Sequence, residues 1–150
     1  MNSNVQIAWL NRWLLLIFPS YLRYMSMLDR NRMWSDRFRA DSRDLMKQLL
    51  DEQTAICQRI ADWVDKLDGH PEIAQFPEDA ARLNFLEMAV AVKKTIERLE
   101  YNLAALESDR RDVAGDNELA ELLEEAIDLM RHHIHLLRPL AAEFSASHGK

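Results

Sequence analysis

The amino-acid sequence predicts an all-α protein, an antiparallel four-helix bundle that forms one domain over residues 1–150. Apolar residues recur at steps of three, four and seven along most of the chain, which is the period of one helical face. Only three glycines and four prolines interrupt 150 residues, too few for the many turns of an all-β fold. With 48% apolar and 29% charged residues, the chain can bury one continuous core beneath a charged surface.

The first segment contains Pro19 and therefore allows two arrangements. Pro19 either kinks one long helix or lies in the first turn of a helix that runs to about Trp34. In the second arrangement residues 3–17 form a separate N-terminal helix, and residues 1–18 extend the bundle. No clear turn separates Trp34 from Asp41, so the boundary with the second segment stays open.

The second segment carries a helical stripe of apolar residues. They are Leu45, Leu49, Ile56, Ile60, Val64 and Leu67. The stretch "DGHPEIAQFPED" then breaks the pattern. Gly69 suits the C-terminus of a helix, and the run Pro77-Glu78-Asp79 suits the start of the next one.

Two further stripes complete the bundle. The third consists of Leu86, Ala89, Ile96, Leu99, Leu103 and Leu106. The fourth consists of Leu119, Leu123, Ala126, Met130, Ile134, Leu137, Ala141 and Phe144. Between them lies the polar run "ESDRRDVAGDNE", where Asp116 or Asn117 is a plausible N-cap. We expect residues 145–150 to form a tail.

Composition favours a cytoplasmic protein that acts neither in membranes nor on nucleic acid. Cys57 is the only cysteine, so the chain can form no internal disulfide. The apolar stretch "WLLLIFPSYL" is too short to span a bilayer and is flanked by Arg12 and Arg23. Residues 1–47 carry eight Arg/Lys and four Asp/Glu, whereas the remainder is strongly acidic and would repel phosphate.

Three histidines lie within four positions in "LMRHHIHLLRPL" and raise the question of a metal site. His133 flanks the apolar stripe of the fourth segment. Asp128, His132 and His135 share a different face, from which they could bind one divalent ion. That face continues upstream through acidic residues, as a solvent-facing or subunit-contact stripe does. We therefore expect no metal here, and keep Fe, Mn or Zn as the alternative.

The second segment holds the remaining chemical candidates. Glu52 or Gln53 fills a gap in its apolar stripe, and Asp51 and Asp62 lie on its flanks. A carboxylate at the edge of a bundle core can be a metal ligand, but it is more often a boundary residue that reaches water. No Gly-rich phosphate loop or Gly-x-Ser-x-Gly motif is present. We therefore lean against an enzyme.

Three of the four tryptophans, Trp9, Trp13 and Trp34, fall in or beside the first segment. One bundle face cannot easily cover all three, and exposed aromatic side chains mark contact surfaces. We expect them to form an interface with a second copy or with a partner protein.

Several stretches resemble the Dps-type ferritin-like proteins. Residues 49–69, "LLDEQTAICQRIADWVDKLDG", resemble the second helix of that family, and residues 122–138, "LLEEAIDLMRHHIHLLR", are similar to its last helix. The stretch "YLRYMSMLDRNRMW" stands where its first helix would be. The resemblance implies a ferritin-like bundle that assembles with copies of itself.

The same resemblance implies an iron-oxidising site, and here the sequence departs from the family. Met33 precedes Trp34 where the family has histidine, and Lys47 stands four residues before Asp51 where another histidine is expected. Only Asp51 and Asp62 correspond to ligand positions, and the interval between them is about one helical turn short. The scaffold and its assembly therefore carry over better than iron oxidation does.

Three functional hypotheses follow. The leading one is a non-catalytic ferritin-like bundle that acts through self-association or partner binding. The second is a divergent metal-binding or ferroxidase-type protein that uses Asp51, Asp62 or the Asp128/His132/His135 face. The third is a small adaptor or immunity-type protein that docks through its first helix.

Overall fold

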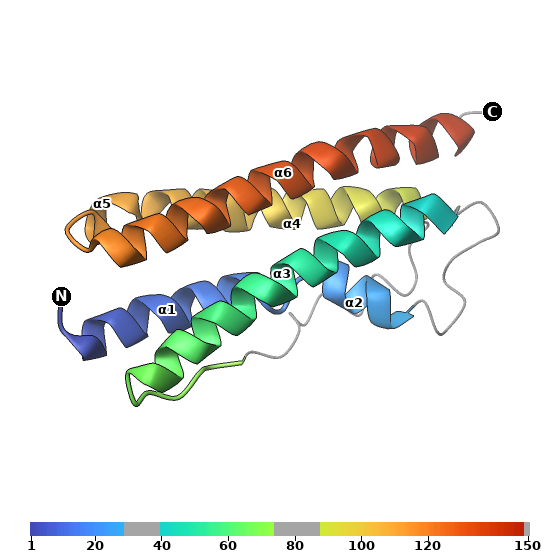
Figure 1. Cartoon of the computed structure of the whole chain (residues 1–150). Coiled ribbons are helices and arrows are strands. Elements are labelled where there is room, and N and C mark those ends of the chain that lie inside the picture. The colour runs from blue at the N-terminus through green and yellow to red at the C-terminus, as the bar shows by residue number, and fades with distance from the viewer. Residues whose placement is uncertain (29–39, 74–87, 149–150) are drawn as a thin grey trace.

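The structure, a computed structural model, describes residues 1–28, 40–73 and 88–148. The regular elements in these ranges are six α-helices, and no described residue lies in a β-strand (Figure 1). The helices are α1 (Ser3–Ile17), α2 (Tyr21–Leu28), α3 (Ala40–Lys66), α4 (Met88–Ser108), α5 (Arg110–Val113) and α6 (Asn117–His148). The prediction of an all-α protein is confirmed.

The long helices are arranged as two pairs. α4 packs along α6, and α1 packs along α3. In each pair the helices run in opposite directions (Figure 1). Contacts of α3 with α6 and of α1 with α4 join the pairs. α3 ends and α4 begins at opposite ends of the molecule, so these two helices run in the same direction (Figure 1).

The N-terminal segment follows the two-helix arrangement. Asn2 caps α1, because its side-chain oxygen accepts a hydrogen bond from the Val5 N–H at 2.9 Å. Ser20 caps α2 in the same way and accepts from the Arg23 N–H at 3.1 Å. Pro19 lies just before the cap of α2, so it neither kinks one long helix nor lies in the first turn of the next one, the two positions considered from the sequence. Trp34 lies outside the described residues.

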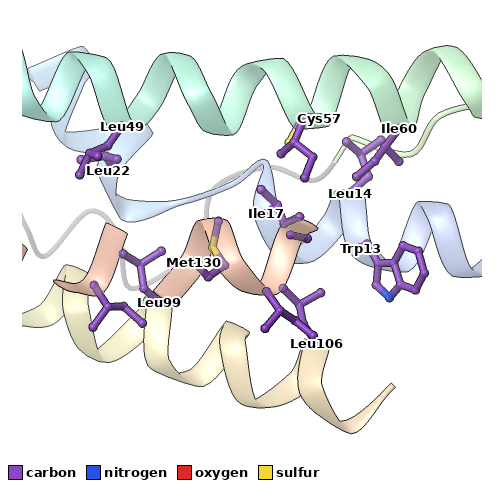
Figure 2. Packing of buried hydrophobic residues seen from close by; sticks show 14 of the residues in the cluster. Trp13, Leu14, Ile17, Leu22, Leu49, Cys57, Ile60, Leu99, Leu106 and Met130 are labelled. Atoms are coloured by element: carbon purple, nitrogen blue, oxygen red, sulfur yellow. The ribbon is translucent and has the colours of Figure 1, made fainter. Parts of the chain in front are cut away.

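The predicted apolar stripes supply the core. Side chains from α1, α2, α3, α4 and α6 meet in it. Figure 2 labels Trp13, Leu14, Ile17, Leu22, Leu49, Cys57, Ile60, Leu99, Leu106 and Met130. In the second stripe Leu49, Ile60 and Val64 are fully buried. In the fourth stripe every member from Leu119 to Leu137 is buried. Burial of these faces provides the main favourable free energy of folding. The helix start expected at residues 77–79, and Leu86, lie outside the described residues.

α3 ends in a Schellman motif one residue earlier than the glycine suggested. Asp68 adopts the left-handed conformation with φ of 61°. Its N–H donates to the Asp65 carbonyl at 3.0 Å, and the Gly69 N–H donates to the Val64 carbonyl at 2.9 Å. Gly69 meets a different requirement: a Cβ there would lie 2.9 Å from Cδ1 of Ile7. The glycine therefore lets α1 approach the end of α3 closely.

The polar run before α6 is more structured than the sequence indicated. It contains α5, and both Asp109 and Val113 are buried. Asp116 is the N-cap of α6, as predicted, because its carboxylate accepts from the Leu119 N–H at 3.1 Å. α6 continues through Pro139 to His148, so much of the expected tail is helical. None of the helices in the described ranges has the length and apolarity to cross a membrane.

Candidate functional site

α3 and α6 lie antiparallel, and polar residues follow the line where they meet; we call this line the α3–α6 seam. The hydrogen bond between Glu52 and His133 and the ion pair between Arg59 and Glu125 set its register. The seam contains two features with the potential for function. One is a buried polar cluster, and the other is a groove nearer the start of α6.

The buried polar cluster consists of Glu52, Gln53 and His133. Gln53 and His133 are both fully buried, and the Glu52 side chain is 34% exposed. Gln53 Nε2 lies 3.1 Å from His133 Nδ1, and His133 Nε2 lies 2.8 Å from Glu52 Oε2. An amide nitrogen can only donate, so Nδ1 accepts, and the ring proton is on Nε2, which donates to the Glu52 carboxylate.

The surroundings keep this histidine neutral. Burial lowers the pKa of His133 below its ordinary value of 6.5, and the hydrogen bond to Glu52 opposes that shift only in part. The same hydrogen bond lowers the pKa of Glu52, which therefore stays ionised. His132 also acts on both groups through its charge when it is protonated.

The cluster is suited to joining helices. Both ring nitrogens of His133 are engaged, so neither has a lone pair free for a metal ion or a substrate. Gln53 Oε1 is buried and has no hydrogen-bond partner among the described residues. The hydrogen bonds of His133 to Gln53 and Glu52 join α6 to α3 at one register.

The second feature is a groove of about 500 Å³ between the C-terminal half of α3 and the first turns of α6; we call it the α3–α6 groove. Its lining residues are Arg59, Asp62, Trp63, Lys66, Glu118, Glu121, Leu122 and Glu125. Trp63 is partly buried and Leu122 is buried, whereas the charged residues are exposed. The groove thus has an apolar strip between charged side chains.

The histidine-rich face of α6 is exposed. Asp128, His132 and His135 all lie on the solvent side of the helix. The Asp128 carboxylate is 74% exposed and lies 3.9 Å from the Arg131 guanidinium. No group of three or more His, Cys, Asp or Glu side chains in the described ranges is arranged to hold a metal ion. Metal binding by this face stays a hypothesis for solution experiments.

The two carboxylates matched to the ferritin-like pattern lie apart on α3. Asp51 is exposed beside Lys47 and Glu52, and Asp62 is exposed in the α3–α6 groove, where Gln58 Nε2 donates to it at 2.8 Å. Eleven residues of helix separate them by about 16 Å. These two side chains therefore do not fit one metal centre within a single chain.

The tryptophans predicted to form an interface divide between core and surface. Trp13 is 0% exposed, and its Nε1 donates to Asp109 Oδ2 at 3.0 Å, so it is a core residue and no longer an interface candidate. Trp9 is partly exposed, with its ring centroid 6.2 Å from that of Trp13. Trp34 falls in the range that the structure does not describe.

No protein-family model matches this chain, and no curated protein and no solved structure matches it either.

Sequence reasoning placed Gln53 and His133 near the core without joining them. Glu52 or Gln53 fills the gap between Leu49 and Ile56 in the second stripe, and His133 flanks the fourth stripe beside Ile134. Two polar residues that interrupt stripes on antiparallel helices can satisfy each other when they lie at the same depth. That coincidence of depth was the available signal, and it depends on the pairing of the helices.

Proposed function

We propose that the protein is a non-catalytic four-helix bundle with ferritin-like connectivity that acts by association, in the first place with further copies of itself. Two antiparallel pairs, with α3 and α4 running in the same direction, support this connectivity, because ferritin-like bundles have one long crossover between their halves. The resemblance of residues 49–69 and 122–138 to Dps-type helices points to the same scaffold.

The observation that carries the functional proposal is an apolar surface on the first helix; we call it the α1 patch. Val5, Trp9 and Leu16 lie on one face of α1; Val5 is 39% exposed, whereas Trp9 and Leu16 are partly buried and also pack against the core. Arg12 shares that face of α1. Tyr101 of α4 is 64% exposed, and the next residue, Asn102, donates from Nδ2 to the Leu16 carbonyl at 3.0 Å. The patch therefore spans two helices.

A surface of this kind is suited to protein contact. Aromatic residues are enriched at interfaces, and an arginine among them can bind at the rim of the contact. Arg12 is already held, because its Nε donates to Asp109 Oδ2 at 2.8 Å, so little side-chain entropy is lost when a partner covers it. These features support a preformed contact surface.

The test is the mass of the assembled protein at micromolar concentration. We expect the unmodified chain to form a homo-oligomer, and Val5→Glu and Tyr101→Glu to shift it toward the monomer. Both side chains are exposed, so neither substitution removes core packing. Ala55→Glu is the matched control, because it adds the same charge at an exposed position of α3. A monomeric unmodified chain would overturn the proposal, as would patch variants that keep the oligomer intact.

A further inference from the structure

The α3–α6 groove has an unbalanced set of charges. Four carboxylates line it, from Asp62, Glu118, Glu121 and Glu125, against the cations of Arg59 and Lys66. Arg59 already forms an ion pair with Glu125, and this pair lowers the pKa of Glu125 and raises the pKa of Arg59. Three carboxylates then remain against one lysine.

Two of these carboxylates are available for an incoming cation. In the part of the chain that the structure describes, neither Glu118 nor Glu121 takes part in an ion pair. Among the described residues, Asp62 accepts a hydrogen bond from the neutral amide of Gln58 and forms no ion pair. All three side chains are exposed; Glu118 and Glu121 line the groove from α6 and Asp62 lines it from α3.

The floor of the groove is apolar, so a ligand that fits it carries an apolar group beside its cationic groups. Trp63 and Leu122 lie between the charged walls, and they come from facing positions of the two helices. A volume of about 500 Å³ is enough for one or two large side chains. An occupant that is only cationic would leave this apolar strip in contact with water.

We propose that the α3–α6 groove binds a cationic amphipathic peptide segment of a partner protein, with Lys or Arg side chains paired to Glu118 and Glu121 and an apolar side chain packed on Trp63 and Leu122. Recognition of an amphipathic helix in a groove uses this combination of apolar anchors and flanking charges. A second copy of this chain fits less well, since it brings the same excess of carboxylates, and the chain as a whole carries a net charge of −6. Phosphate-rich partners are repelled for the same reason.

The experiment measures binding of synthetic peptides to the full chain by isothermal titration calorimetry at low ionic strength. The probe is a short peptide of Lys and Leu at helical spacing, and the comparison peptides replace Lys by Glu or Leu by Ser. We expect the Lys/Leu peptide to bind and both comparison peptides to bind at least about tenfold more weakly. Amide chemical-shift changes should be concentrated at residues 58–66 and 118–126.

Charge-removing variants locate the site. Glu118→Gln with Glu121→Gln should weaken binding of the Lys/Leu peptide about tenfold, because the substitutions remove two partners of the peptide's cations without changing side-chain size. The control is Glu97→Gln with Glu100→Gln, which removes the same charge from exposed positions of α4. If both pairs of substitutions weaken binding equally, binding depends only on the net charge of the protein and the proposal is wrong. Absence of binding, or shifts that lie outside the groove, would also overturn it.

The groove is formed by α3 and α6 and the α1 patch by α1 and α4, so their tests separate. Tyr101→Glu should leave peptide affinity unchanged, and Glu118→Gln with Glu121→Gln should leave the oligomeric state unchanged. If Glu118→Gln with Glu121→Gln instead dissociates an oligomer, a second copy occupies the groove and the peptide proposal is wrong.

Discussion

Asp109 offers the sharpest test of how the first helix is held in the fold. It is 4% exposed and accepts three hydrogen bonds across the chain: from Trp13 Nε1 at 3.0 Å, from Arg12 Nε at 2.8 Å and from an Arg12 terminal nitrogen at 3.2 Å. Asp109→Ala removes all three hydrogen bonds at once. The Trp13 ring is fully buried, so its N–H then has no water to replace the carboxylate.

The magnitude follows from the exposure of the two donors. Leaving the buried Trp13 N–H unsatisfied costs about 1–3 kcal/mol. Arg12 is 45% exposed, so water screens its pair with Asp109, and the loss of that pair adds only about 0–1 kcal/mol. We expect Asp109→Ala to lower the free energy of unfolding by about 1–4 kcal/mol. Asp109→Asn keeps an acceptor for Trp13 and should cost less.

Urea unfolding followed by tryptophan fluorescence and circular dichroism measures this difference. Glu124→Ala is the control, because it breaks an ion pair with Arg110 in which the side chains are 48% and 41% exposed. The control should change stability by no more than about 0.5 kcal/mol. If Asp109→Ala costs no more than the control, the buried acceptor does not hold α1 in place and the reasoning fails.

Three further predictions concern buried groups. Because burial lowers the pKa of His133, the folded state binds fewer protons than the unfolded state. The contribution of His133 to stability should therefore be complete above about pH 6.5 and be lost as the pH falls through that value toward the folded pKa. His133→Gln should remove this pH-dependent step when urea unfolding is measured across that range. Cys57 is buried with its pKa raised to about 12, so iodoacetamide should fail to label it in the native protein at pH 8 and label it readily in urea; rapid native labelling would contradict its placement. Gly69→Ala should destabilise by about 1 kcal/mol, because the added Cβ would lie 2.9 Å from Ile7 Cδ1 and 3.0 Å from Val64 Cγ1. Ile7→Val removes only the first of these contacts, so it should relieve part of the cost in a double-mutant cycle, and additive costs would refute the contact.

The helices themselves followed from the sequence because apolar periodicity is a local property. The stripe from Leu119 to Leu137 predicted α6, and Asp116 predicted its start. Local patterns also separated His133, which lies toward the core, from His132, which faces solvent.

What could not be predicted depends on contacts between distant segments. Asp109 lies in a polar run that reads as an exposed loop, and its burial is compensated only because Arg12 and Trp13 reach it from α1. The same contact takes Trp13 out of the surface where its neighbour Trp9 remains. The α3–α6 groove likewise joins residues from two helices, so its charge balance appears only after they are paired.

Native mass spectrometry of the full chain, purified without chelator, tests the association proposal most directly. At micromolar concentration we expect a homo-oligomer whose mass is a whole multiple of 17.6 kDa, with no additional metal mass. A monomer would contradict self-association. A stoichiometric metal ion would contradict the non-catalytic scaffold and favour the metal-binding alternative, for which loss of the metal on combining His132→Ala with His135→Ala would place the ion on α6.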